Sequence, residues 1–352
     1  MRIAQISPLW ESVPPPAYGG TEAVVHLLTD ELVKRGHQVT LFASGDSTTS
    51  ARLQSVYPRS LRTAPFVAHA SPYEWVHVAS ALERAEEFDI IHNHDGELPM
   101  AMSGMVNTPM LTTMHCIIAP DTKIVWDSYR GYFNTISWAE RRTMPRIRNH
   151  RFVGVVYNGI DVGSFPFRRD KEDHLLCLGR IAPEKGTHLA IEVARRLGKK
   201  LILAGKVDRV DREYFASEVK PRIDGKLIHF FGEANAHQKR ELYANASCVL
   251  EPIVWEEPFG LVTVEAMACG TPVISFNRGA APELIVDGET GFLVNDVDAM
   301  VEAVSRLDKI DPQTCRRHVA DHFDVPRMVD GYLAAYGMVL SATRGSAGLV
   351  LA

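Results

Sequence analysis

Several features that mark secreted or membrane-spanning proteins are missing from this chain of 352 residues. Its five cysteines are odd in number and scattered, and none are spaced as Cys-x-x-Cys, so we expect reduced thiols and a cytosolic protein. No apolar run reaches about 18 residues, and the chain enters a strand at once without a signal-peptide pattern. A membrane-spanning role is therefore not expected, whereas peripheral attachment at the inner membrane face is compatible with the sequence.

An excess of charge of one sign is also missing. The net charge of −5 gives no general attraction to nucleic acid, and no nucleic-acid partner is expected. A local exception is an arginine cluster between residues 130 and 151, opposed only by Glu140. Either a solvated connection or a surface for an acceptor or an anionic lipid fits this cluster. It comprises Arg130, Arg141, Arg142, Arg146, Arg148 and Arg151.

Short apolar runs alternate with amphipathic stretches almost throughout, which is typical of parallel sheets covered by helices on both faces. The length and a hydrophobic fraction of 46% allow two full cores. A polar, Pro-containing crossing at 165–171 follows the turn at 158–161 and separates two rounds of the pattern. We therefore predict an α/β protein of two doubly wound domains, 1–165 and 166–325, facing across a ligand-binding cleft. A helix at about 326–341 could return to the first domain.

The predicted elements follow from the same pattern. Strands are expected at 2–7, 38–43, 90–92, 110–115, 134–137 and 152–157, and in the second domain at 174–179, 200–204, 227–231, 248–252 and 272–276. Helices are expected at 20–35, 73–87, 187–197, 211–219, 237–246, 261–268 and 298–307.

The most informative segment runs from Glu257 to Glu265, where a loop with Pro and Gly enters a helix. Pro258 lacks an N–H and Gly260 lacks a side chain, so the chain can turn sharply and leave the amides of about Leu261–Thr263 free. Free amides at a helix start suit a phosphate or diphosphate. Glu257 precedes the helix and Glu265 lies about 7.5 Å along it. The two acids therefore flank the anion, which is the layout that a nucleotide sugar needs.

Two further loops carry ligand-binding chemistry. Arg180 and Lys185 are cations five residues apart on one strand-to-helix loop of the second domain, where an anion is expected to bind. Gly19 and Gly20 let the backbone approach a ligand at the first helix, but the segment is not Gly-x-Gly-x-x-Gly, so NAD is disfavoured. Surface charges and a plain turn are the structural alternatives.

Other polar residues are weaker candidates. His115 ends a strand, where it is either a structural residue or one that bonds a substrate hydroxyl or positions a leaving group. Its neighbour Cys116 lacks an evident activating base. The pair Asp296 and Asp298 fits a helix cap better than a metal site. The segment 92–95 offers ligand-capable groups without an identifiable further partner, so no metal site is expected there.

In this order, these segments make the chain resemble the retaining glycosyltransferases of family 4, which have the GT-B fold. The resemblance covers roughly residues 2–310, and its most specific part runs from 257 to 274, followed by matches at 282–285 and 288–294. Tyr157 stands where the family commonly has Pro before the Asn-Gly turn.

The resemblance implies transfer of a sugar from a UDP- or GDP-sugar to a hydroxyl acceptor, with retained anomeric configuration and no required metal or cofactor. Arg180 and Lys185 would hold the diphosphate, Glu265 the ribose and Glu257 the hydroxyls of the donor sugar. From the first domain, Gly19 and Gly20 would face the phosphates and His115 would lie by the transferring sugar. The implied catalytic residues are His115, Arg180, Lys185 and Glu257, and the implied donor-binding residues are Gly19, Gly20, Arg180, Lys185, Glu257, Phe259, Gly260, Leu261, Val262, Thr263 and Glu265.

The acceptor could be a small molecule, a saccharide or a lipid-linked sugar, and the residues favour no particular oligomeric state. A nucleotide-sugar epimerase, a sugar phosphorylase and a non-catalytic nucleotide-sugar-binding protein are the competing hypotheses. A retaining glycosidase fits poorly, because its carboxyls stand about 5–5.5 Å apart.

Overall fold

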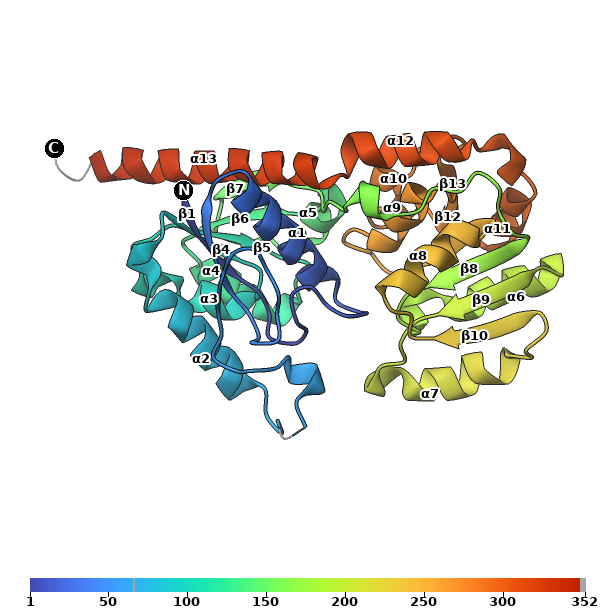
Figure 1. Ribbon diagram of the computed structural model, residues 1–352, viewed down its shortest axis with the longest axis horizontal. Helices are drawn as coiled ribbons and strands as arrows, with labels where there is room; N and C mark the ends of the chain where they lie inside the picture. The colour runs from blue at the N-terminus through green and yellow to red at the C-terminus, as the bar shows by residue number, and fades with distance from the viewer. Residues whose placement is uncertain (66, 349–352) are drawn as a thin grey trace. The chain divides into compact units, whose positions relative to one another are not determined.

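The computed structural model describes residues 1–65 and 67–348, which divide into two units (Figure 1). The first unit contains Met1–Gly159 and the C-terminal segment from Val325, and the second unit contains Ile160–Asp324. The division after Gly159 comes a few residues before the predicted boundary at 165.

The first unit is built on a seven-stranded parallel sheet of order β3-β2-β1-β4-β5-β6-β7. The strand order reverses between β1 and β4, so the carboxyl ends of these neighbours form the switch point where such sheets bind ligands. The strands are β1 (Arg2–Ile6), β2 (Gln38–Phe42), β3 (Arg52–Gln54), β4 (Ile90–Asn93), β5 (Met110–Thr113), β6 (Tyr132–Thr135) and β7 (Phe152–Val155).

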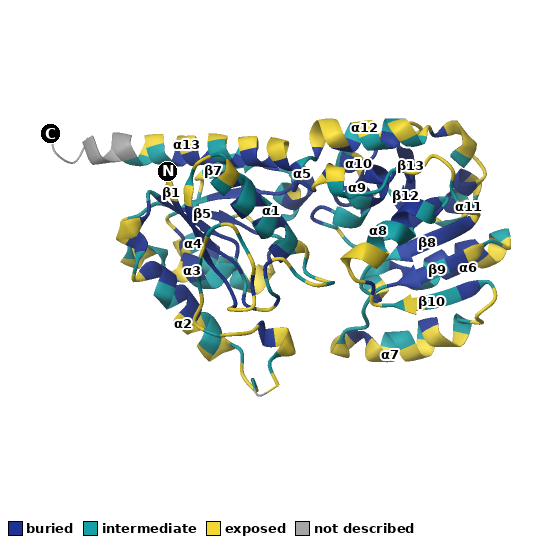
Figure 2. Cartoon of the chain, viewed as in Figure 1, coloured by how far each residue is buried: buried dark blue, intermediate teal, exposed yellow. Residues whose placement is uncertain are grey.

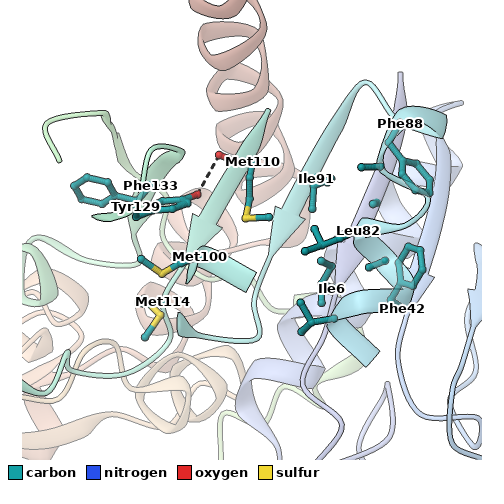
Figure 3. Close-up of a cluster of buried hydrophobic side chains, with 14 of the residues drawn as sticks. Ile6, Phe42, Leu82, Phe88, Ile91, Met100, Met110, Met114, Tyr129 and Phe133 are labelled. Carbon is teal, nitrogen blue, oxygen red and sulfur yellow. Dashed lines mark hydrogen bonds between the residues drawn. The ribbon is translucent and has the colours of Figure 1, made fainter. Parts of the chain in front are cut away.

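Helices cover this sheet and close an apolar core. Ile6, Phe42, Ile91 and Phe133 from the strands belong to this cluster (Figure 3), which also contains Trp126, and each is almost fully buried. The Tyr129 hydroxyl donates to the Met110 carbonyl at 3.1 Å, which satisfies a polar atom within the core. The longer helices are α1 (Gly20–Lys34), α2 (Ser71–Leu82), α3 (Glu97–Met102), α4 (Lys123–Ser128), α5 (Trp138–Thr143) and α13 (Val325–Gly348).

The C-terminal helix α13 belongs to the first unit although it follows the second in sequence. It packs along α1 and β7 (Figure 1). Arg35, which directly follows α1, pairs with Asp330 of α13 at 2.5 Å, and Tyr332 and Tyr336 of α13 are fully buried. The chain therefore returns to complete the first hydrophobic core.

The second unit repeats the architecture with six parallel strands of order β10-β9-β8-β11-β12-β13. Its switch point lies between β8 and β11. The strands are β8 (His174–Leu178), β9 (Lys200–Ala204), β10 (Ile228–Gly232), β11 (Cys248–Glu251), β12 (Val273–Phe276) and β13 (Gly291–Val294). The helices are α6 (Thr187–Leu197), α7 (Arg212–Tyr214), α8 (Ala236–Asn245), α9 (Leu261–Ala268), α10 (Ala281–Leu284), α11 (Val297–Val304) and α12 (Pro312–His322).

In both units the strands are mostly buried and the helices expose one face (Figure 2). This explains why continuous apolar runs predicted the strands. The predicted helix at 211–219 is irregular, because α7 passes directly into a π-helical turn at Phe215–Val219. The predicted strand at 110–115 ends earlier, at Thr113.

Candidate functional site

The start of α9 lies in the loop that follows β11, on the carboxyl edge of the second sheet. Gly260 precedes the helix with φ of 104°, a left-handed conformation that glycine adopts without strain. A Cβ atom at this position would lie 3.3 Å from Thr263 Oγ1. The glycine at this position therefore allows the turn from which α9 starts.

The amides at this helix start do not all remain available. Leu261 and Val262 are too early in the helix for an intrahelical acceptor, and neither donates to another part of the described chain. The Thr263 amide donates to the Gly260 carbonyl at 3.1 Å. The prediction of three free amides was therefore wrong for Thr263, because the first turn tightens.

Lys185 and Glu257 are brought together beside this helix start. Lys185 ends a 3-10 turn (Pro183–Lys185) after β8, and its ammonium group donates to Glu257 Oε2. The same oxygen accepts a hydrogen bond from Trp255 Nε1 at 2.6 Å, and the Lys185 ammonium lies 5.4 Å from the centre of the Trp255 ring. Glu257 is thus held by two donors on one oxygen.

Arg180 is surrounded by acids of its own unit. Its guanidinium donates to Asp211 Oδ2 at 2.7 Å and to Glu184, and Asp208 lies at 4.0 Å. Its charge is therefore already balanced, and a phosphate must share or replace these partners. Sequence reasoning missed Asp208 and Asp211, for which the only signal was their place after β9, the neighbour of β8.

A buried carboxyl group underlies the site. Glu251 ends β11 and is 6% exposed, and its Oε2 accepts from the Thr263 hydroxyl at 2.5 Å. Burial, with Glu257 and Glu265 adding to it, raises the pKa of Glu251 to about 7. An acid at the end of an apolar strand was the only sequence signal for this residue.

The side chains of Glu265 and Phe259 have different neighbours. Glu265 accepts from the Tyr243 hydroxyl at 2.8 Å and lies 3.6 Å from the Lys239 ammonium, both on α8. Phe259 is buried, with its ring 6.0 Å from that of Phe323. Phe259 therefore offers a ligand only its backbone.

In the first unit, Gly19 and Gly20 form the start of α1. Gly19 has φ of 142°, and a Cβ there would lie 2.8 Å from Cβ of Pro15. Glu22 in the first turn is buried, and its Oε2 would lie 3.0 Å from a Cβ atom at Gly19, so a carboxylate of the chain itself stands close to this helix start. The backbone of Gly19 therefore passes close to Pro15, and the predicted approach of these glycines to a ligand stays a prediction.

His115 lies two residues beyond β5, and the residue is partly exposed. Its Nε2 is 2.9 Å from Nδ1 of His94. Burial of the ring lowers the pKa of His115 to about 4, so the imidazole is neutral at pH 7. Desolvation of the Cys116 thiol, together with the carboxylates of Glu97 and Glu140, raises its pKa to about 11, which opposes a nucleophilic role.

Two motifs with metal-like spacing have structural roles. Asp296 accepts from the Ala299 amide at 2.8 Å, which confirms that it caps α11. His92 and His94 are buried, and their rings form hydrogen bonds with neighbouring side chains. Within the described ranges, no three His, Cys, Asp or Glu side chains gather in a way that could hold a metal.

Most of the arginine cluster lies away from the ligand-binding edge. Four of its six members, Arg130, Arg146, Arg148 and Arg151, belong to the segments that lead into β6 and β7, at the amino ends of these strands. Glu140 does not oppose them as a surface acid: it is 1% exposed, accepts from the Ile136 amide, and has a pKa raised by burial to about 8. One acid beside the cluster is Asp127, which accepts from the Arg148 amide at 2.8 Å.

Among the described residues, no helix has both the length and the apolar character that crossing a bilayer requires.

Two Rossmann-like units in one chain, with a helix start and cations on one sheet edge, define the GT-B class of glycosyltransferases. The model of Glycosyltransferase Family 4 matches residues 18–163, and that of Glycosyl transferases group 1 matches residues 164–318. The chain belongs to this glycosyltransferase family and is a glycosyltransferase, and the predicted GT-B fold is confirmed.

Named relatives agree with this family. The chain is 28% identical to a glycogen synthase of Mycobacterium tuberculosis, over 90% of this chain and 88% of that protein. It is 25% identical to a D-inositol 3-phosphate glycosyltransferase of Mycolicibacterium smegmatis, over 93% and 88% of the two chains.

Solved structures agree on the fold. Sucrose-phosphate synthase from Thermosynechococcus elongatus superposes with a TM-score of 0.77 at 20% identity, over 97% of this chain and 99% of that one. An Anabaena protein in complex with UDP and glucose superposes with a TM-score of 0.74 at 18% identity, over 96% and 100%.

Proposed function

We propose that this enzyme transfers a hexosyl group from a UDP- or GDP-sugar to a hydroxyl acceptor, with retention of the anomeric configuration. The acceptor classes that we consider are small molecules, saccharides and lipid-linked sugars. The names of the relatives support a sugar donor and a hydroxyl acceptor, and the Anabaena neighbour was solved with UDP and glucose. Five free cysteines support a cytoplasmic location, with the arginine cluster available for peripheral membrane contact.

The observation that carries this proposal is the pairing of Lys185 with Glu257 at the start of α9. Oε2 of Glu257 is occupied by Lys185 and Trp255, whereas no hydrogen bond from the described residues reaches Oε1. We assign Oε1 to a hydroxyl of the donor sugar. The Lys185 ammonium on the other side of the carboxylate is then placed for the adjacent phosphate.

The remaining roles follow from charge. Breaking the bond between the anomeric carbon and the diphosphate leaves negative charge on the released phosphate. Arg180, Lys185 and the Leu261 and Val262 amides are proposed to stabilise that charge without a metal ion. The acceptor oxygen bonds to the anomeric carbon, and its proton goes to the released phosphate oxygen. Glu265 is proposed to bind the ribose.

The test is a transfer assay with UDP-, GDP- and ADP-sugars and a panel of hydroxyl acceptors, with and without a chelator. We expect glycoside formation that survives chelation, with the donor's anomeric configuration in the product. Arg180→Ala and Glu257→Ala should each lower kcat by about 100-fold, the effect of losing one charge-stabilising or positioning group. Lys199→Ala is the matched control, because Lys199 pairs with Asp173 on the surface of the same unit.

Other outcomes would point elsewhere. Wild-type rates in both variants would remove the assigned roles. Turnover without an acceptor would identify an epimerase, and turnover that requires free phosphate would identify a phosphorylase. Tight donor binding in calorimetry with no turnover would identify a non-catalytic binding protein.

A further inference from the structure

Three histidines of the first unit meet at the carboxyl ends of β4 and β5. The rings of His92 and His94 lie 3.9 Å apart, and those of His94 and His115 lie 5.2 Å apart. Hydrogen bonds extend from this group through Gln5 of β1 to Tyr336 of α13. No role assigned so far uses His92 or His94.

The direction of these hydrogen bonds follows from the Gln5 amide. Its Nε2 donates to the Tyr336 hydroxyl at 3.1 Å, so its Oε1 must accept from His94 Nε2 at 2.9 Å. His94 then carries its proton on Nε2 and has a bare Nδ1. That Nδ1 lies 2.9 Å from His115 Nε2, which must therefore be the donor.

A second branch from the same amide has a consistent direction. The Tyr336 hydroxyl accepts from Gln5 and can donate to His92 Nδ1 at 2.7 Å. His92 Nε2 then donates to Thr113 Oγ1 at 2.7 Å. The Thr113 hydroxyl donates to Asn134 Oδ1 at 2.5 Å. Each N–H or O–H proton in the two branches is therefore assigned to one donor atom.

The assignment requires neutral rings, and the surroundings provide them. Burial lowers the pKa of His92 and His94 well below the ordinary value and lowers that of His115 to about 4. A neutral imidazole carries one N–H, so fixing the proton on one nitrogen leaves the other as an acceptor.

We propose that His94 is a positioning residue that holds His115 as the Nε2–H tautomer and so leaves its Nδ1 as a hydrogen-bond acceptor. No described residue donates a hydrogen bond to that Nδ1. A substrate hydroxyl that donates its proton fits this nitrogen, whereas a carbonyl or phosphate oxygen does not. The use of His115 toward a substrate rests on the proposed function, but its tautomer does not.

The tautomer can be read without any substrate. Full-length protein labelled with 15N-histidine is measured by long-range 1H–15N NMR, and the His115 ring is identified by the signals lost in His115→Gln. We expect a protonated Nε2 and a bare Nδ1 in the wild type. A His115 protonated on Nδ1 in the wild type would overturn the proposal, even if no transferase activity is found.

Two variants of similar size test the acceptor atom at position 94. His94→Leu removes it, whereas His94→Asn can keep an oxygen near the place of Nδ1. With the leucine we expect a mixture of His115 tautomers and a loss of about tenfold in kcat, the effect of one hydrogen bond. The asparagine should restore the single tautomer and most of the rate.

His77→Leu is the control, because His77 is also buried in the same unit, and among the described residues its ring bonds only to the Ser7 carbonyl. It should leave the His115 tautomer and kcat unchanged. A single Nε2–H tautomer in His94→Leu would contradict the proposal, as would an unrestored mixture in a folded His94→Asn. If the leucine variant does not fold, the wild-type spectrum and His94→Asn still decide.

Discussion

At the scale of single residues, the cations of the second unit are already bound to acids before a ligand arrives. Arg180 pairs with Asp211 and Glu184, and Lys185 pairs with Glu257. Such partners hold long side chains in one orientation and lower the cost of desolvating them. We expect the diphosphate of the proposed donor to join or replace these carboxylates at side chains that are already held in place.

The residue-scale prediction concerns Glu251, whose folded pKa of about 7 lies above its ordinary value of 4.5. As pH rises, the Glu251 carboxyl loses its proton in the unfolded chain before it does so in the folded protein. The stability that the protonated carboxyl contributes is therefore fully present below pH 4.5 and is lost as pH rises through about 7. We expect Glu251→Gln to gain stability over the wild type between pH 5 and pH 8, by at most about 3 kcal/mol. Urea unfolding at both pH values measures this gain.

The control for Glu251 is Glu302→Gln, which changes an exposed acid on α11 of the same unit. This substitution should leave the pH dependence of unfolding as it is in the wild type. Parallel stability curves for the wild type and Glu251→Gln would show that Glu251 does not titrate in this range.

At the scale of elements, the start of α9 depends on one backbone conformation. Gly260→Ala forces a residue with a Cβ to φ of 104° beside Thr263. We expect a loss of about 1–3 kcal/mol in stability and a rise of about tenfold in the KM for the donor, since the helical amides shift. Chemical denaturation and donor kinetics measure the two effects.

Gly337→Ala provides the matched control for Gly260. Gly337 is exposed within α13, and a Cβ there meets nothing within 4 Å. This change should stabilise the protein by up to about 1 kcal/mol and leave donor kinetics unchanged. An unchanged KM in Gly260→Ala would show that the helix start does not hold the donor.

Sequence patterns predicted the inner strands, most of which are buried along their length, and also β7, whose four residues are all partly exposed. The missed elements are short or exposed: β3 has three residues, and α12 buries only Cys315 and Val319. The four-residue strand β13 was missed as well, because its apolar run is no longer than many loops. A local sequence pattern is weak evidence for a short element when contacts with other parts of the fold decide whether that element forms.

At the scale of the whole molecule, the order of the strands in the sheet explains which part of the site could be predicted. Lys185 and Glu257 meet because β8 and β11 are neighbours at the switch point, as the doubly wound pattern implied. Asp211 and Glu251 could not be foreseen, since their contacts depend on how the side chains pack. The return of α13 brings Tyr336 to Gln5, a contact between residues 331 apart in sequence.

The two units also differ in how they bind protons. In the first unit, burial lowers the pKa of five histidines below the ordinary value of 6.5, and it raises that of Glu140 and Asp95. The five histidines are His37, His77, His92, His94 and His115. In the second unit, three histidines have lowered pKa values, and Glu251 acts in the opposite sense, as Glu140 and Asp95 do in the first unit. The first unit sets five lowered histidines against two raised acids and the second sets three against one, so we expect the larger proton uptake on unfolding in mild acid from the first unit.

This difference predicts that acid unfolds the first unit before the second. The depressed histidine pKa values give stability that is present above pH 6.5 and lost as pH falls toward about 4, worth about 3 kcal/mol for His77 alone. Hydrogen exchange by mass spectrometry, corrected for intrinsic rates, should show loss of protection first in β1, β4 and β5 between pH 6.5 and 4.5. His77→Gln should move that loss to lower pH. Earlier exchange in β8 and β11 than in the first sheet would contradict the prediction.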